Sequence, residues 1–271
     1  MDEALANLGV KLDLTRAMLT FSLILTRVLT VVTVAPFLGG KQAPPEVKMG
    51  IGIAFAILLM PLVIQYQTGP IPIDPINYFL MVVKEAWVGF MLGFIAAELF
   101  YAVDMAGRII DLARGTNQVQ LMIPQLGERS SAFGDLFYQL LLVIFMFLDG
   151  HHVFIAAMFE SFRVVPLDAF PNLSLGLWPL TEMFIRYSAD IFTIGVTISA
   201  PVAIACLITE MSFGLLNRVA PQINAYFMAM PAKVFVGGVM FLVALPMLLE
   251  LLAEMSASML LLGQKLLILL P

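Results

Sequence analysis

Residues 78–107 read YFLMVVKEAWVGFMLGFIAAELFYAVDMAG and combine an apolar run with charged side chains. The run is longer than the roughly 17–25 residues that one membrane-spanning helix needs. Lys84, Glu85, Glu98 and Asp104 nevertheless lie inside it. A charge that faces lipid at the bilayer centre costs about 2.5–3.5 kcal/mol on insertion scales, so these side chains cannot all face hydrocarbon. The stretch therefore predicts a long helix whose charged side chains contact other protein.

Small residues in the same stretch favour tight helix packing. Gly89 and Gly93, in GFMLG, form the small-xxx-small pattern that lets two helix backbones approach closely. The pattern is common, so it supports a packed assembly only together with the charges.

The composition of the whole chain is that of a membrane-associated protein. The 271 residues are 61% hydrophobic and 12% charged, against about 45–50% and about 25% in soluble domains. The net charge of −5, without a basic block, argues against nucleic acid as a partner. The acidic start, MDEALANLGVKLDLTR, lacks the basic region of a signal peptide, so we expect the first apolar run to remain in the mature protein. The single cysteine, Cys206, excludes a disulfide within the chain.

Apolar segments recur along the sequence and are separated by breaks rich in proline and glycine. Helix is the expected conformation of each segment, because an isolated strand leaves its backbone groups unpaired in lipid. The breaks, at 39–45, 68–75 and 166–179, are expected to be turns or extended chain. We predict an all-α fold of about six long, membrane-associated helices in one domain, residues 1–271. The six segments are Ala17–Leu38, Met49–Ile64, Tyr78–Gly107, Phe133–Met158, Trp178–Ile208 and Val234–Ala253, followed by an apolar tail to Pro271.

Lysine and arginine are unevenly distributed between the loops. The first, third and fifth loops carry 7 of them, while the termini and the even loops carry 4. Because positively charged loops tend to stay in the cytoplasm, this favours odd loops in the cytoplasm and both termini on the other side.

Charged side chains inside the apolar segments need partners in the protein. Glu182, Arg186 and Asp190 follow one another at intervals of four residues, so they lie on one helix face and can pair locally. For Arg27 and Glu98 we expect a partner on another helix or another subunit. Two interpretations remain open: an ion or proton path, and interhelical pairs in an assembly whose helices mostly contact protein. The predicted buried charges are Arg27, Glu98, Asp104, Arg186 and Asp190.

The sequence contains no recognisable catalytic motif. Asp149-Gly150-His151-His152 is its only histidine cluster. Zinc needs further ligands at suitable spacing, and adjacent histidines on a helix point about 100° apart. GxxxxGK[ST], GxGxxG and GxSxG are absent. We therefore predict no enzyme activity, no metal and no cofactor, and we interpret the histidines as a helix-end anchor at a polar boundary.

Residues 115–131, GTNQVQLMIPQLGERSS, are typical of neither a solvated loop nor a core helix. Amides mingle with apolar side chains, and Pro124 and Gly127 prevent a continuous helix. Amides and soft, adaptable methionine could close a pore without gripping any one sequence. An ordinary cytoplasmic connection is the alternative.

With these pieces together, the chain resembles the SctT/FliR family, the export-gate subunits of type III secretion systems, over nearly its whole length. One matching stretch runs from Arg27 to Pro45, with Lys48 after it: an arginine in the first apolar run, a Pro-Phe turn and a proline-containing connector. A second stretch is 133–162, where FLDGHHVF and ESF are similar to the family's glycine–histidine stretch and the segment after it.

The most specific part of the resemblance is an NRxxPQxN run at 217–224, preceded by Gly214 and followed by Pro231 and Lys233. In addition, GRIIDLARGTNQ, residues 107–118, is more similar to the injectisome branch (SctT) than to the flagellar branch (FliR). We therefore expect an injectisome protein, with a flagellar one as the alternative.

The resemblance implies a function and a place in the cell. Such proteins join SctR- and SctS-like subunits (FliP- and FliQ-like in flagella), with an SctU/FlhB-like subunit as a further partner, in a helical assembly of the bacterial inner membrane. The lumen conducts unfolded protein substrates out of the cytoplasm. The resemblance also implies that the subunit is built from helical hairpins, much of which stand toward the periplasm. Its charged, over-long helices would then face mainly sibling subunits rather than membrane lipid. By the same resemblance, the residues of the loop that plugs the lumen are Gly115, Asn117, Gln118, Gln120, Met122, Pro124 and Gln125.

Residues 214–234, GLLNRVAPQINAYFMAMPAKV, then have an explanation within such an assembly. Pro221 and Pro231 are expected to break the chain between two long helices, and the amides can pair the backbone groups that the breaks free. Arg218 can bind a carboxylate or a helix C-terminus of a neighbouring subunit. The predicted joint and subunit contact consists of Asn217, Arg218, Pro221, Gln222, Asn224, Pro231 and Lys233.

Functions of other classes remain as alternatives. A proton- or ion-coupled small-molecule transporter would use Glu98, Asp104 or Asp190 as its titrating group, beside a broken helix. An intramembrane hydrolase using His151 and Asp149 is a third hypothesis. An assembly subunit expressed alone should be unstable or aggregated in detergent, whereas a transporter should purify alone and bind a solute.

Overall fold

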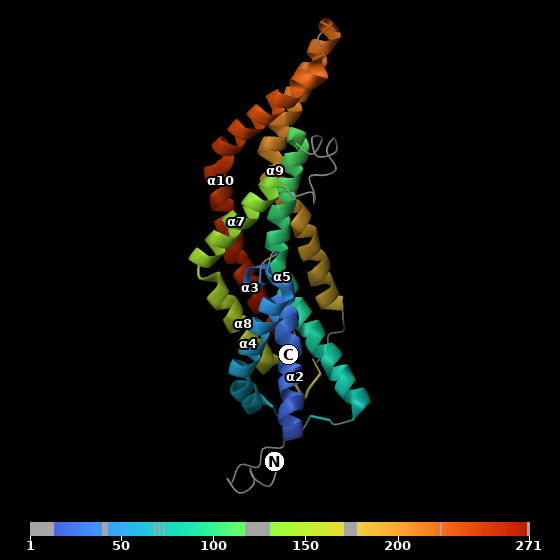
Figure 1. Cartoon of the computed structure of the whole chain (residues 1–271), viewed down its shortest axis with the longest axis vertical. Coiled ribbons are helices and arrows are strands. Elements are labelled where there is room, and N and C mark those ends of the chain that lie inside the picture. Colours follow the sequence, from blue (N-terminus) through green and yellow to red (C-terminus); the bar gives the residue numbers. More distant parts are fainter. Residues whose placement is uncertain are drawn as a thin grey trace. The chain divides into compact units, whose positions relative to one another are not determined.

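The computed structural model describes residues 14–39, 43–67, 69, 71–72, 74–116, 131–170, 178–222 and 224–269, with the backbone alone for 179, 180 and 257–269. Every regular element in these ranges is a helix (Figure 1), so the predicted all-α fold is confirmed. The helices are α2 (Leu14–Val34), α3 (Pro36–Gly39), α4 (Pro45–Tyr66), α5 (Pro75–Arg114), α7 (Ala132–Phe147), α8 (Gly150–Val164), α9 (Trp178–Val219) and α10 (Ala225–Leu269).

Five of the described helices are long and apolar enough to cross a membrane, and α7 with α8 could together form a sixth span. α5, α9 and α10 have 40, 42 and 45 residues. At about 1.5 Å per residue each would be about 60 Å or more in length, roughly twice the hydrocarbon core of a bilayer. A large part of each helix therefore lies outside the hydrocarbon of a single crossing.

Several boundaries expected from the sequence need correction: α9 and α10 are both longer than the predicted segments, and Ala17–Leu38 is divided between α2 and α3. α4 and α5 begin at Pro45 and Pro75, because proline is well suited to the first helical position, where its missing N–H costs nothing. α5 continues beyond the apolar run 78–107 to Arg114. The predicted segment Phe133–Met158 is interrupted: α7 ends at Phe147, and Asp149 adopts a φ of 55° before α8 begins.

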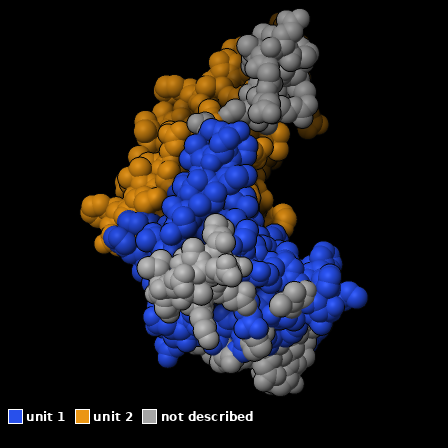
Figure 2. All heavy atoms as spheres, turned by 60° about the horizontal axis from the view of Figure 1, so that its bottom comes forward, with its two compact units in different colours: residues 1–97, 151–180, 260–271 blue, residues 98–150, 181–259 orange. Residues whose placement is uncertain are grey.

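The chain divides into two compact units, which Figure 2 colours separately. Unit 1 consists of residues 1–97, 151–180 and 260–271, and unit 2 consists of residues 98–150 and 181–259. Each unit is assembled from separate parts of the chain, and α5 contributes to both. One domain over residues 1–271 stays a prediction.

In unit 1, α2 packs against α4 and against the first part of α5. A Cβ added to Gly89 would lie 2.5 Å from the carbonyl oxygen of Arg27, and one added to Gly93 would lie 2.8 Å from Cβ of Val34. No larger residue fits this approach of α5 to α2, which explains the GFMLG sequence. The interior between the helices is filled by aliphatic side chains such as Leu23, Val28, Leu59 and Val88.

In unit 2, the second part of α5 packs against α7, while α7 contacts α10. The backbones of α5 and α7 touch at Gly107, where an added Cβ would overlap the backbone around Gly134. Aromatic rings add contacts: the centroids of Phe100 and Phe145 lie 5.9 Å apart between α5 and α7, and those of Phe137 and Phe241 lie 5.7 Å apart between α7 and α10.

Candidate functional site

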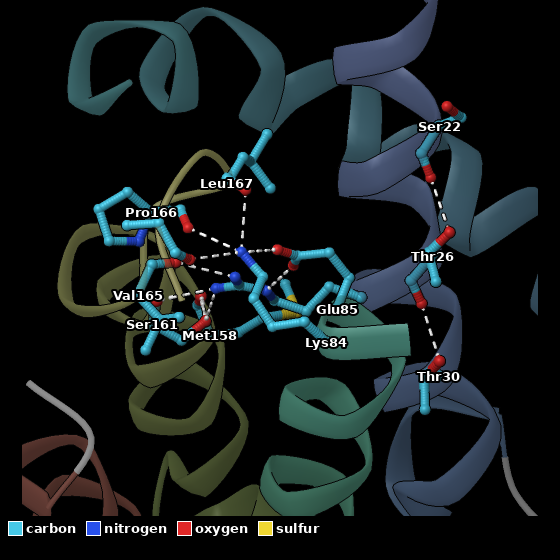
Figure 3. Close-up of polar contacts among 12 residues, drawn as sticks. Ser22, Thr26, Thr30, Lys84, Glu85, Met158, Ser161, Val165, Pro166 and Leu167 are labelled. Atoms are coloured by element: carbon cyan, nitrogen blue, oxygen red, sulfur yellow. Dashed lines mark hydrogen bonds and ion pairs between the residues drawn. The ribbon is translucent and has the colours of Figure 1, made fainter. Parts of the chain in front are cut away.

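Three charged side chains form an ion cluster in the interior of unit 1, shown in part in Figure 3. Arg27 comes from the middle of α2, and Lys84 and Glu85 are adjacent on α5. Their side chains are 0%, 4% and 0% exposed. Glu85 joins the two cations, because one of its oxygens pairs with Nε of Arg27 and the other lies 2.7 Å from Nζ of Lys84.

The ion cluster binds the backbone at the end of α8 (Figure 3). Five carbonyl oxygens, 2.8–2.9 Å from the donor nitrogens, accept hydrogen bonds from the two cations. They belong to Ser161 and Val165, which accept from Arg27, and to Pro166, Leu167 and Ala169, which accept from Lys84. The last carbonyl groups of a helix lack partners within it and carry the negative end of its dipole. Arg27 therefore caps α8, and Lys84 fixes the chain that follows it.

The surroundings of Arg27 complete its burial. Its guanidinium lies over the ring of Phe162, 4.1 Å from the centroid, which adds a cation–π contact. The close approach at Gly89 brings α5 near enough to α2 for Glu85 to reach it. The sequence indicated that Arg27 needs a distant partner, but it did not single out Lys84 and Glu85 as site residues. The signal in the sequence that could have identified them was a lone arginine in one apolar run together with a Lys-Glu pair in another.

The remaining charges of α5 lie in unit 2. Glu98 and Asp104 are buried, at 6% and 8% exposure. Asp104 pairs with Arg108 one turn later, with 2.8 Å between Oδ2 and Nε. Asp111, which was not among the predicted buried charges, is more deeply buried than either, at 3%.

Arg186 and Asp190 differ from the prediction, because both are exposed on α9. The side chain of Arg186 is 75% exposed and lies 2.7 Å from Glu182, one turn earlier. An acid and a base that satisfy each other on a helix surface need no buried partner, which is the physical reason for the exposure of Arg186. Within this chain the two residues therefore do not belong to the buried charges.

The segment 214–234 contains one break and not two. α9 continues to Val219, Pro221 lies in the turn that follows, and α10 begins at Ala225. Pro231 is inside α10, so the predicted second break is wrong. Proline is tolerated within long membrane helices because neighbouring groups satisfy the carbonyl that it leaves without a donor.

The other residues of the predicted joint fall into two groups. Lys233 is buried and lies 3.3 Å from Oε2 of Glu210, so it joins α10 to α9 inside unit 2. This ion pair links the two helices on either side of the predicted joint, and the assignment of Lys233 to the joint and subunit contact stays a prediction. The remaining polar residues of the joint are exposed in this chain: Asn217, Arg218, Gln222 and Asn224.

Most of the predicted plug residues lie outside the described part of the chain. Gly115 is described and follows the last residue of α5 with a φ of 78°, a left-handed conformation that glycine adopts without strain. The residues of the plug prediction that fall within 117–130 are not described: Asn117, Gln118, Gln120, Met122, Pro124 and Gln125.

The two histidines lie at the start of α8 and are closer together than simple helix geometry predicts. The ring centroids of His151 and His152 are 4.1 Å apart, with 35° between the ring planes. The expectation that their side chains diverge is therefore wrong. Their interpretation as a helix-end anchor stays a prediction.

Comparison with known proteins assigns the chain to a family. The model of a family described as "Bacterial export proteins, family 1" matches residues 18–259. The chain is 27% identical to the flagellar biosynthetic protein FliR of Bacillus subtilis, over 83% of this chain and 85% of the relative. It is 27% identical to the Yop proteins translocation protein T of Yersinia pestis, over 94% and 96%. It is 28% identical to the secretion system apparatus protein SsaT of Salmonella typhimurium, over 72% and 74%.

Relatives named for flagella and relatives named for secretion systems thus match at similar identity, which agrees with the resemblance found in the sequence. The matched residues run from α2 into α10 and include both units. With its apolar spanning helices, the chain is a membrane protein, and it belongs to family 1 of the bacterial export proteins.

Proposed function

We propose that this chain is a core subunit of a type III export apparatus in the bacterial inner membrane. With SctR-like and SctS-like subunits, and an SctU-like subunit beside them, it forms a gated pore that conducts unfolded protein substrates. Part of the chain stands toward the periplasm. The observation that carries this proposal is the family match over residues 18–259.

The surface of α9 supports a multi-subunit assembly independently. Large apolar side chains remain exposed along α9 from Ile185, at 60%, through Phe192, at 65%, to Val219, at 87%. These positions extend over about 50 Å of helix, whereas a bilayer supplies only about 30 Å of hydrocarbon. Exposed apolar surface beyond that depth requires cover by protein, which neighbouring subunits of an export gate provide.

Two parts of the chain have separate roles in this proposal. The exposed joint around Arg218 contacts a neighbouring subunit, because a guanidinium at a helix end can bind a carboxylate or the carbonyls of another helix bidentately. The segment 115–131 helps to close the pore, since its amides and methionine can seal without recognising one sequence. The injectisome rather than the flagellum is our assignment, on the similarity of residues 107–118.

One experiment with two variants tests these roles in cells that express the partner genes. Arg218→Ala should reduce co-purification of the partners and secretion together. Deletion of residues 119–124 should leave co-purification intact but make the membrane leak ions or small solutes. Unchanged co-purification and secretion in the first variant contradict the subunit contact, and unchanged permeability in the second contradicts the plug. If the unmodified chain purifies alone as a stable monomer that binds a solute, the transporter alternative is correct.

A further inference from the structure

One carboxylate in unit 2 contacts residues on both sides of the segment 117–130. Asp111 lies in the last turn of α5 and is 3% exposed. Before the segment, Thr116 Oγ1 lies 3.3 Å from Oδ1 of Asp111 and 2.9 Å from its backbone oxygen. After the segment, Ser131 Oγ donates to Oδ2 of Asp111 at 2.6 Å, and the backbone N–H of Phe133 donates to the same oxygen at 3.2 Å.

The same contacts build the start of α7. Ser131 is the N-cap residue, and its hydroxyl accepts from the N–H of Gly134 at 2.9 Å while it donates to Asp111. The first N–H groups of a helix have no partner within the helix, and a negative charge beside them is favoured by the helix dipole. Asp111 thus satisfies one of these groups directly, at Phe133, and orients the hydroxyl that satisfies another.

Two further contacts hold α5 against α7 at this point. The backbones meet at Gly107, where an added Cβ would overlap the chain around Gly134. The guanidinium of Arg114 lies over the ring of Phe133, 4.6 Å from the centroid. Asp111 therefore lies between two fixed contacts, so its carboxylate cannot shift far from the hydroxyl and amide groups that it binds.

We propose that Asp111 is a positioning residue. Its carboxylate binds Ser131 and Phe133, and its backbone oxygen together with the carboxylate binds Thr116, so the described residues that flank 117–130 on both sides are held at one point of unit 2. A hydroxyl pair alone could not do this, because each hydroxyl has only one proton to donate. The carboxylate has two oxygens that accept several hydrogen bonds at once.

Amide hydrogen exchange in the full chain, purified in its complex, tests the proposal. Asp111→Ala removes the acceptor of the Phe133 amide and frees the Ser131 hydroxyl. We expect exchange of the amides of residues 133 and 134 to become about tenfold faster, while the rest of unit 2 keeps its protection. Asp111→Asn keeps the shape and one acceptor oxygen, so its exchange should lie between that of the alanine variant and that of the unmodified chain. This second variant also provides a test if the alanine variant does not assemble.

Two comparisons distinguish positioning from a general loss of stability. Asp135→Asn removes an exposed acid from the first turn of the same helix, so it measures the general effect of a charge near this helix start, and it should accelerate the amides of residues 133 and 134 far less than Asp111→Ala does. Adding Ser131→Ala to Asp111→Ala should accelerate the Gly134 amide no further than Ser131→Ala alone, because Asp111 acts on this amide through the Ser131 hydroxyl, which Ser131→Ala already removes. Unchanged exchange in the Asp111 variants, or an equal increase throughout unit 2, overturns the proposal.

The functional consequence rests on the proposed role of residues 115–131 in closing the pore. If that role is correct, membranes that contain the Asp111→Ala complex should leak as those of the 119–124 deletion do. Faster local exchange without leakage would keep Asp111 as the positioning residue and contradict the plug. The two hypotheses therefore fail in different measurements.

Discussion

The ion cluster makes a sharp prediction for Glu85→Gln. The substitution keeps the size and shape of the side chain and removes its charge. Glu85 pairs with both Arg27 and Lys84, and all three side chains are at most 4% exposed. The variant would therefore leave two buried cations next to each other, with backbone carbonyls but without the carboxylate between them.

The size of the effect follows from the burial. Removing one partner of a buried ion pair typically costs about 3–5 kcal/mol, because it leaves a buried charge uncompensated. Glu85 has two such partners, so we expect the upper part of this range. That corresponds to about three powers of ten in the unfolding equilibrium constant. The matched control is Glu182→Gln, since the Glu182–Arg186 pair has the same 2.7 Å separation as Glu85–Lys84, but Arg186 is 75% exposed. An exposed pair contributes about 0–1 kcal/mol.

The free energies of unfolding can be compared by pulse proteolysis of the purified complex in detergent, over a denaturant series, with the intact chain quantified. Adding Lys84→Met to Glu85→Gln removes one of the two unpaired cations, so the double variant should be more stable than Glu85→Gln alone. If Glu85→Gln and Glu182→Gln differ by less than about 0.5 kcal/mol, which is within the usual scatter of surface substitutions, the reasoning is refuted.

Two further predictions concern packing and partial burial, and both are measured with the same unfolding series. Gly107→Ala should destabilise unit 2 by about 1–3 kcal/mol, because the added methyl overlaps the backbone around Gly134. Its control is Gly214→Ala, which should be neutral or stabilising by up to about 1 kcal/mol, since an added Cβ there meets no atom within 4 Å. Equal effects of the two alanines would contradict the close contact of α5 with α7. Lys233→Met should lower the free energy of unfolding by only about 1 kcal/mol, because the carboxylate of Glu210, 57% exposed, is hydrated when its partner is removed. A loss as large as that of Glu85→Gln would show that exposure does not control the energies of these ion pairs.

Composition and periodicity could predict the helical class, because a chain with this apolar content satisfies its backbone groups in lipid only as helices or closed sheets. The sequence also indicated that Arg27 requires a partner and that Gly89 and Gly93 allow a close helix contact. It could not predict that Pro231 lies inside α10, because the local sequence around a proline that ends a helix does not differ from that around a proline tolerated within one. The tertiary neighbours of the helix decide between them.

The identity of the family was likewise accessible from the sequence, because the run around Asn217–Asn224 and the order of the apolar segments are local features of the chain. Which charges are buried was not accessible. Arg186 and Arg27 both lie in apolar runs, yet one is exposed beside Glu182 and the other is fully enclosed. The local sequence around a charged residue in an apolar helix does not show whether that residue lies on the face that other helices cover. Only the packing of α2, α5 and α8 placed Lys84 and Glu85 beside Arg27, since burial depends on residues that are distant in sequence and close in space.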